Sequence, residues 1–590
     1  MKLKKIVVIL IFVSILTQFL SGNFYNKSIA VNNTIDFYKK VETNNDSNNT
    51  INVRYSYDYG LTEKSYLQTN ANGTISRIEY IRSSNKIIVE TYSSEFNYIS
   101  SVSIPLELSI WGGFFSGEKY NFLVFGQKNL NEDDNVETIR IVKYSKDWKR
   151  ISCCSIKGNN TFVPFDFGNC RMAETSSQLI IHTCHTMYKT DDGYHHQANT
   201  TYRINKENME LLYESYNIMN ASYGYVSHSF NQFVTADENY YYTADHGDGY
   251  PRSLCLIKHK YEHDGVVNDF YHKSSVVGKA DIVKFPGNIG ENKTMAMLGG
   301  LELGNNNVIV VGTQQNKSGS VEKYGTQNLF ISAINKNDIT NEFKYDPQRD
   351  IYYNPSNESV KIKWLTDYDR DSNIKIGCPE VIKLNNDRFL LIWNQDEQLK
   401  MLLFDENLNL LSNVTTINIK LTDCKPIVYN GKVTWYKTNR EGKLTFYYID
   451  PNNLSQYENL KEQTIYPVTM SKSQINLVVN QNNSSNAETL SITNISNEIG
   501  NVKSIDWKVS PSSNTNIEYN ISDSEITKYL KITKNNDKEI IIEPVYADMQ
   551  NKDFIIKTIV NNGSEAEGYG ECRIGLSVSV SNIEIKARHI

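Results

Sequence analysis

Proline is scarce in this chain, with 12 residues among 590. Proline lacks a backbone N–H and interrupts strand pairing, so its scarcity leaves long stretches free to form β-sheet. The sequence is also short of positive charge, because the net charge is −6 and lysine and arginine are scattered without forming a basic stripe. A nucleic-acid partner therefore has no electrostatic support, and we expect none.

Long apolar stretches are missing outside the N-terminus, where residues 6–16 are apolar except for Ser14. Basic residues precede this run, and they are Lys2, Lys4 and Lys5. This pattern is typical of a secretory signal peptide, and the run is short for a membrane span of about 20 residues. We predict a signal peptide within residues 1–30 and a secreted or cell-surface protein. If the signal is not cleaved, residues 6–20 are the only expected membrane anchor.

Several catalytic motifs are absent from the sequence. It has no Gly-x-Ser-x-Gly elbow, no phosphate-binding glycine loop and no Cys-x-x-Cys metal pair. The eight cysteines show no compact disulfide spacing, and Cys378 and Cys424 fall at matching places in two repeats. Matching places favour small buried side chains over pairing. We therefore expect mostly free, buried thiols and at most one disulfide.

The strongest positive signal is that for β-strands. Tyrosine is abundant, at 39 residues, and short runs that alternate between apolar and polar side chains lie between Asn, Asp, Gly or Ser. Aromatic residues and a period of two are typical of strands. Many short strands at regular spacing predict an all-β sandwich, barrel or propeller.

Two pairs of internal repeats favour the propeller. A Gly pair followed by an apolar strand that ends in Gly occurs at 111–126 and again at 298–312. A Cys-led strand followed by a second strand that ends in Trp occurs at 378–393 and 424–435. Repeats of about 40 to 60 residues with this content are typical of propeller blades.

We predict a β-propeller over residues 50–452 with about seven blades. Six or eight blades, or a set of stacked sandwiches, are the alternatives. Asn52–Tyr57 is expected to supply the strand that the last blade lacks and so to close the ring. The expected blades span 60–107, 108–160, 165–217, 222–284, 292–368, 375–420 and 422–452.

The C-terminal part of the sequence is distinct. Residues 453–465 are polar and are expected to form a linker, and residues 466–590 contain seven strand-like runs with Trp507 in the middle of the third. About seven short strands with a central Trp are typical of an immunoglobulin-like β-sandwich.

A resemblance to known proteins rests on Ile505–Trp507, the Ser-rich loop that follows, and the closing run 568–574. On these features, residues 466–588 resemble the bacterial immunoglobulin-like domains appended to surface and secreted proteins. The resemblance implies a spacer or adhesion unit. This sequence departs from the antibody pattern because Cys572 has no partner cysteine within the module. The region 50–452 is similar to secreted bacterial propellers in blade texture only, and no characterised family is indicated.

Nine of the ten histidines lie between residues 182 and 272. In this stretch, polar side chains that can bind ligands or transfer protons stand where strands elsewhere in the chain have apolar or small polar residues. Because successive residues of a strand face opposite sides, His182 and His185 would not chelate one metal as a helical His-Glu-x-x-His pair does. The candidate ligand-binding residues are His185, His196, Asn199, His228, Asp245, His246 and Arg252.

Three interpretations of these residues remain open. They can tie neighbouring blades together through hydrogen bonds, or they can line a ligand pocket at the mouth of the channel, where the guanidinium of Arg252 suits an anion. The third is a metal or general acid–base site made from His185, His196, His228, His246 and Asp245. A bound metal ion is compatible with the sequence but is not required by it.

The function predicted from the sequence is that of an extracellular or cell-surface binding or adhesion protein. Its ligand, a glycan or a protein, is expected to bind near residues 182–252. One alternative is a propeller enzyme, either a hydrolase or a transferase, that acts on an extracellular small molecule or glycan. The other alternative is a purely structural surface protein without a pocket.

Overall fold

The computed structural model describes most of the chain and leaves the predicted signal peptide within residues 1–30 outside the described residues. Those described are 36–41, 43, 45–47, 49, 60–216, 224–262, 275–291, 295–316, 325–341, 344–348, 351–438, 444–462, 464–479, 487–513, 517–545, 551–561 and 566–578. Almost all of the regular structure in these residues is β-strand, which confirms the all-β class.

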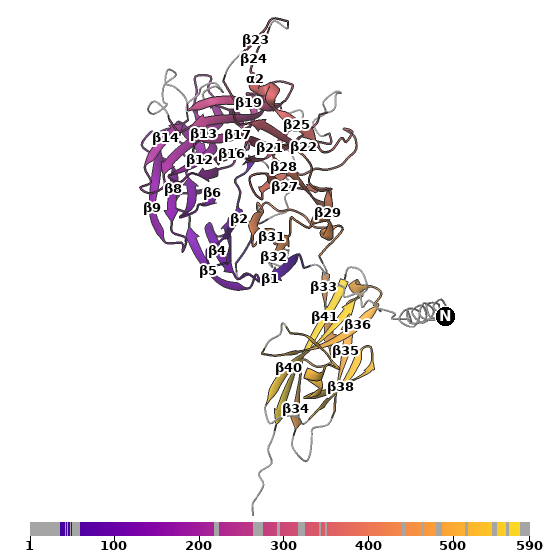
Figure 1. Ribbon diagram of the computed structural model, residues 1–590. Helices are drawn as coiled ribbons and strands as arrows, with labels where there is room; N and C mark the ends of the chain where they lie inside the picture. Colours follow the sequence, from indigo (N-terminus) through magenta and orange to yellow (C-terminus); the bar gives the residue numbers. More distant parts are fainter. Residues whose placement is uncertain are drawn as a thin grey trace, which may run out of the picture. The chain divides into compact units, whose positions relative to one another are not determined.

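Two compact units make up the chain (Figure 1). The ring unit comprises residues 1–415 and 420–458, and the C-terminal unit comprises residues 416–419 and 459–590. Within the described residues, the strands from β1 to β32 include seven four-stranded groups, here called blades, and only the end of β29 is counted with the C-terminal unit. Figure 1 shows the blades following one another around a ring.

The first four blades occupy the N-terminal half of the ring unit. Blade 1 consists of β2 (Ser65–Thr69), β3 (Ile75–Ile81), β4 (Lys86–Tyr92) and β5 (Tyr98–Pro105). Blade 2 consists of β6 (Ile110–Ser116), β7 (Asn121–Gly126), β8 (Glu137–Tyr144) and β9 (Arg150–Lys157). Blade 3 consists of β11 (Arg171–Glu174), β12 (Gln178–Lys189), β13 (His195–Asn205) and β14 (Leu211–Ser215). Blade 4 consists of β16 (Phe233–Ala236), β17 (Tyr240–Tyr250), β18 (Ser253–Lys260) and β19 (Val276–Lys284). The short strand β15 (Ser227–Ser229) pairs with both β13 and β17 and so joins blades 3 and 4, and β10 (Thr161–Pro164) pairs with β12, which gives one ten-stranded sheet.

The remaining three blades follow in sequence. Blade 5 consists of β20 (Met297–Leu303), β21 (Asn307–Gln314), β22 (Asn328–Asn335) and β25 (Lys361–Trp364). Between β22 and β25 lie the hairpin β23 (Lys344–Asp346) and β24 (Ile351–Tyr353) and the short helix α2 (Pro355–Ser359). Blade 6 consists of β26 (Glu380–Lys383), β27 (Arg388–Gln395), β28 (Gln398–Asp405) and β29 (Thr415–Ile417). Blade 7 consists of β30 (Ile427–Tyr429), β31 (Lys432–Thr438), β32 (Leu444–Ile449) and β1 (Tyr38–Val41).

The first strands of neighbouring blades contact one another, for example β6 with β11, β11 with β16, and β20 with β26. These first strands therefore face the inside of the ring, and the arrangement is propeller-like. The apolar side chains of successive blades pack together between them, as in the cluster shared by β20, β21 and β18.

The repeated Gly pair has a physical explanation in this arrangement. The pairing of β6 with β7 shifts register between Trp111 and Gly113, and the pairing of β20 with β21 shifts between Leu298 and Gly300. A Cβ on Gly113 would lie 2.7 Å from the carbonyl oxygen of Cys170, just before the next blade. The Gly pair thus gives each of these first strands a bulge and lets the next blade approach closely.

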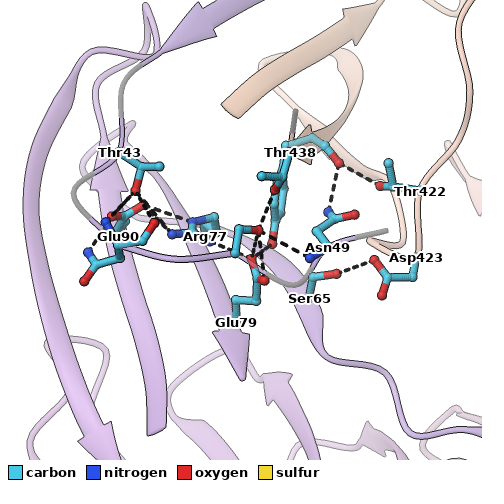
Figure 2. Close-up of polar contacts among 12 residues, drawn as sticks. Thr43, Asn49, Ser65, Arg77, Glu79, Glu90, Thr422, Asp423 and Thr438 are labelled. Atoms are coloured by element: carbon cyan, nitrogen blue, oxygen red, sulfur yellow. Dashed lines mark hydrogen bonds and ion pairs between the residues drawn. The ribbon is translucent and has the colours of Figure 1, made fainter. Parts of the chain in front are cut away.

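Ring closure uses a different strand from the one expected. β1 pairs antiparallel with β32, and Tyr38 lies opposite Tyr447. Asn52–Tyr57, which was expected to close the ring, lies outside the described residues. The chain between β1 and β2 contributes the side chains of Thr43, Asn45, Ser47 and Asn49 to the junction of blades 7 and 1 (Figure 2).

Buried charges hold this junction, here called the seam. Arg77 on β3 lies opposite Glu90 on β4, and its guanidinium contacts Glu90 Oε2 at 2.8 Å and Glu79 Oε2 at 2.5 Å. All three side chains are fully buried. The N-terminal segment and blade 7 supply further hydrogen bonds, since Thr43 Oγ1 donates to Glu90 at 2.6 Å (Figure 2) and Tyr436 OH donates to Glu79 at 2.8 Å.

The C-terminal unit has two sets of strands around one apolar core. One set contains β34 (Gln474–Val479), β36 (Ser504–Pro511), β37 (Tyr519–Asn520), β40 (Lys552–Asn561) and β41 (Ala566–Val578). The other contains β35 (Glu488–Ile495), β38 (Leu530–Asn536) and β39 (Glu539–Pro544), and β33 (Thr464–Met470) pairs with both sets. Two short helices, η4 (Asn497–Ile499) and α3 (Ser524–Thr527), complete it. Trp507 lies in the core and donates its indole N–H to the carbonyl of Asp537. The immunoglobulin-like assignment of this unit stays a prediction.

The expected linker contains some ordered structure. The 3-10 helix η3 (Leu454–Tyr457) follows blade 7, and the side chains of Leu454 and Tyr457 are buried. The ring of Tyr457 lies edge-on to Phe37, next to β1.

All eight cysteines are free thiols, and seven of them are buried. The expectation of mostly free, buried thiols is confirmed, and there is no disulfide among them. In the described part of the chain, no helix has the length and apolar character needed to cross a membrane.

Candidate functional site

A cavity of about 480 Å³ lies inside the ring. Its walls come from the first strands of five blades, β2, β6, β11, β16 and β20, and from β30 and the two residues before it. This origin places it on the ring axis, and it is called the axial cavity below. The lining residues are Glu63, Tyr66, Leu67, Phe114, Phe115, Ser116, Cys170, Arg171, Met172, Ala173, Glu174, Phe233, Val234, Thr235, Ala236, Leu301, Glu302, Lys425, Pro426 and Ile427.

Two ion pairs in the cavity each link blades that are not neighbours. Arg171, on β11 of blade 3, donates to Glu63, which precedes β2 of blade 1, at 2.8 Å and 3.1 Å. This ion pair therefore connects blade 3 to blade 1 and not to blade 2, which lies between them. Arg171 also donates to Asn231 Oδ1 and to the carbonyl of Gln232, and its guanidinium lies 3.6 Å from the centre of the Phe233 ring. Arg171 is therefore held firmly by the protein itself.

The second pair is looser. Lys425, just before β30 of blade 7, contacts Glu302 on β20 of blade 5 at 3.5 Å, and so this pair passes blade 6. The side chain of Lys425 is 40% exposed and that of Glu302 is 18% exposed. A second lysine, Lys383 at the end of β26, also interacts electrostatically with Glu302, although burial lowers the pKa of Lys383.

One end of the cavity wall carries a further lysine and carboxylate. Glu174 accepts a hydrogen bond from the buried Lys206 at 2.8 Å. Ser116, on the same side, accepts a hydrogen bond of 3.0 Å from Lys146, whose pKa is lowered by burial. The thiol of Cys170 is a poor nucleophile because burial raises its pKa to about 12.

None of the seven residues proposed from the sequence lines the axial cavity. Two of them, Asn199 and Asp245, lie in a buried network between blades 3 and 4. Asp245 on β17 accepts hydrogen bonds from Ser229 at 2.7 Å and from Asn199 at 3.5 Å, and it contacts His182 Nε2 at 3.1 Å. His182 also bonds Thr201 through Nδ1 at 2.8 Å. This geometry corresponds to hydrogen-bonded ties between blades.

His185 and His246 are fully buried in separate places. His185 Nδ1 bonds Thr161 Oγ1 at 2.7 Å, and burial lowers the pKa of His185 to about 3. The ring of His246 lies edge-on to Phe285, and burial, together with Arg252, lowers its pKa to about 3. Both imidazoles are neutral at physiological pH.

The remaining proposed residues occupy loops and strand ends. His196 bonds Asp192 at 2.7 Å in the partly exposed hairpin between β12 and β13. The pKa of His228 is lowered by burial and by His196. Arg252 donates to Asp248 Oδ1 and to the carbonyls of Asp248, Pro286 and Glu291. These contacts occupy both terminal nitrogens of the guanidinium that was expected to bind an anion.

The structure therefore does not bring the seven residues together into one site. Among the described residues, no group of three or more His, Cys, Asp or Glu side chains is placed to hold a metal ion. Ligand binding near residues 182–252 stays a prediction from the sequence.

Sequence reasoning missed the charged residues of the axial cavity, although one signal was present. Phe115 and Glu302 hold the same place in the two Gly-pair repeats, two residues after the second Gly, and both line the cavity. The repeat thus marked inward-facing positions. A carboxylate at a position occupied elsewhere by an aromatic side chain was the clue to a polar interior.

No family model and no curated protein matches the chain. Among solved structures, it is similar to Drosophila Semaphorin 1b, extracellular domains 1–2, with 9% identity and a TM-score of 0.38, over 68% of this chain and 88% of that one. It is also similar to a chain of the complex of Drosophila Plexin A with Semaphorin 1b, with 9% identity and a TM-score of 0.35, over 68% and 88%. A quinonprotein alcohol dehydrogenase-like protein from Bacteroides thetaiotaomicron has 11% identity and a TM-score of 0.31, over 61% and 67%. Likenesses at these TM-scores say nothing about function.

Proposed function

We propose that this protein is an exported binding protein that takes a small polar ligand into the axial cavity. The observation that carries the proposal is a cavity of about 480 Å³ crossed by two ion pairs. Ligand sites in proteins typically occupy about 300–1,000 Å³ and combine apolar walls with a few convergent polar groups. The axial cavity has this composition, since aromatic rings such as Phe114 and Phe233 lie beside Glu63 and Glu302.

Export is supported by the basic and apolar N-terminal sequence described above. N-terminal sequencing of the protein recovered from the medium tests it, and the expected start lies after Gly22 or Ala30. We further propose that the C-terminal unit is an immunoglobulin-like spacer or adhesion module, which the central Trp507 supports.

The binding proposal is tested with the purified full chain and a panel of amino compounds, carboxylic acids, monosaccharides and disaccharides. Ligands that raise the melting temperature are then measured by isothermal titration calorimetry. Ala236→Trp places a large side chain into the cavity wall, and it should weaken binding at least tenfold. Ser103→Trp, on the exposed face of β5, is the matched control and should leave affinity unchanged. Equal affinities of both variants would place the ligand elsewhere.

An acyl-transferring enzyme is the second candidate, and the Ser116–Lys146 contact of 3.0 Å favours it. A neutral lysine beside a serine can act as the base that activates the hydroxyl. The lowered pKa of Lys146, caused by burial, is in the direction that this role requires. Hydrolysis of p-nitrophenyl acetate by the wild-type protein, lost in Ser116→Ala, would support the enzyme. Equal rates in both proteins would exclude this serine as the nucleophile.

A further inference from the structure

The charges of the axial cavity point to a class of ligand. We propose that the ligand is a small zwitterion, an amino acid or a short peptide, whose ammonium group binds Glu302 and whose carboxylate binds Lys425. This proposal rests on the proposed function, because it names the ligand class of the same cavity.

The Lys425–Glu302 pair is the one that a ligand can open. Its two charged atoms are 3.5 Å apart, and the lysine side chain is 40% exposed. The Arg171–Glu63 pair, by contrast, has a contact of 2.8 Å and side chains that are 14% and 12% exposed. Pairs that are long and solvated contribute little. Separating Lys425 from Glu302 therefore costs less than separating Arg171 from Glu63.

A ligand that carries both charges can replace the electrostatic contact that Lys425 and Glu302 lose when their pair opens. The ammonium of the ligand meets the carboxylate of Glu302, and the carboxylate of the ligand meets Lys425. Lys383 adds positive charge near the same place. A ligand with one charge would leave either Glu302 or Lys425 without the opposite charge of the opened pair, and a charged group that loses such a partner in a binding site disfavours the incomplete analogue.

The firmly held arginine argues against a phosphate or sulfate ligand. Arg171 already donates hydrogen bonds to Glu63, Asn231 and Gln232, so its guanidinium is not available for bidentate binding of an oxyanion. The apolar part of the ligand can instead lie on Phe233, Leu301 or Ile427, which line the same cavity.

The test compares three compounds of similar shape with the full chain by isothermal titration calorimetry. L-Phenylalanine carries both charges, 3-phenylpropionate carries only the carboxylate, and 2-phenylethylamine carries only the ammonium; L-leucine and glycine extend the zwitterion set. At least one zwitterion should bind, and each matched single-charge analogue should bind at least tenfold more weakly. Equal binding of an analogue overturns the proposal, and so does the failure of all three zwitterions to bind.

Variants of the pair test the assignment of each charge. Lys425→Met and Glu302→Gln should each weaken zwitterion binding at least tenfold. Lys119→Met and Glu207→Gln are matched controls, because this exposed pair outside the cavity has the same distance of 3.5 Å. These controls should bind as the wild type does, and circular dichroism checks that every variant is folded. Unchanged binding in Lys425→Met or Glu302→Gln contradicts the assignment.

Failure of this proposal differs from failure of the proposed function. If a ligand without the two charges binds and Ala236→Trp abolishes its binding, the cavity is a binding site and the zwitterion assignment is wrong. If zwitterions bind with equal affinity to the wild type and to Ala236→Trp, both proposals fail.

Discussion

Replacing Arg77 with methionine should destabilise the ring unit severely. Arg77 is fully buried and is the cation between two fully buried carboxylates, Glu79 and Glu90. Methionine has a similar volume but no charge, so the variant leaves both carboxylates in the protein interior without their cation. Removing one partner of a buried ion pair costs about 3–5 kcal/mol, and a loss at the upper end is expected because two acids share this arginine.

Guanidinium unfolding, followed by tryptophan fluorescence, measures the change in the free energy of unfolding. Arg140→Met is the matched control, because Arg140 also binds two carboxylates, on Glu107 and Glu137, but its side chain is 26% exposed. Partly exposed pairs contribute about 0–1 kcal/mol, so the control should lose no more than that. A loss below about 1 kcal/mol for Arg77→Met would refute the reasoning.

The same reasoning predicts how the Arg77→Met penalty depends on pH. Burial alone raises the pKa of Glu90, but Arg77 and hydrogen bonds from Asn45 and Thr43 outweigh it and lower that pKa. In the wild type this carboxylate adds stability above its unfolded pKa, and the contribution is lost as the pH falls through the folded value. In Arg77→Met, burial is the dominant effect on Glu90 and raises its pKa, so protonating this carboxyl stabilises the folded variant as the pH falls. The difference in the free energy of unfolding between wild type and Arg77→Met should therefore become smaller as the pH falls from 7 to 4.

Three further predictions concern the histidines, the Gly pair and the thiols. Burial lowers the folded pKa values of His185 and His246 to about 3, so unfolding binds protons below pH 6.5 and the free energy of unfolding should decrease as the pH falls. Replacing either with phenylalanine should reduce the pH dependence of this free energy by about 1.4 kcal/mol per pH unit between pH 4 and 6, and an unchanged pH dependence in urea titrations contradicts the assignment. Gly299→Ala places a methyl group against the carbonyl oxygen of Pro379 and should cost about 1–3 kcal/mol, whereas a neutral effect in thermal melts would show that blades 5 and 6 can separate. Cys153 is the one thiol that is not buried, so a thiol reagent should modify one cysteine per native chain rapidly, and fast modification of several would contradict the packing.

The blade pattern could be predicted from the sequence because it is local. Strand alternation and the Gly-pair repeats are each encoded within a short stretch of sequence, and the two repeats mark β6 and β20 in the structure. The closing strand could not be predicted in the same way. Tyr38–Val41 has no signal that separates it from Asn52–Tyr57, and the choice depends on pairing with β32, some 400 residues away.

The residues of the histidine-rich stretch do not converge on one place in the structure, because composition does not show the direction in which side chains point. His182 and Asp245 stand out in the sequence, yet they face each other inside the protein and join two blades. Burial of polar groups requires partners, so a cluster of chemically able residues in strands also arises where blades are tied together. The residues that line the axial cavity are dispersed from Glu63 to Ile427 and form no single cluster in the sequence.

Closure of the ring and the shape of the cavity depend on the same two blades. Glu63 precedes the first strand of blade 1, and Lys425 precedes the first strand of blade 7. The seam lies between these blades, where Arg77 and its carboxylates meet Tyr436 of blade 7. Each ion pair of the cavity therefore has one partner on a blade that borders the seam. Because separating blades 1 and 7 would move Glu63 and Lys425, which both line the axial cavity, we expect the buried charges of the seam to preserve the shape of this cavity as well as the fold.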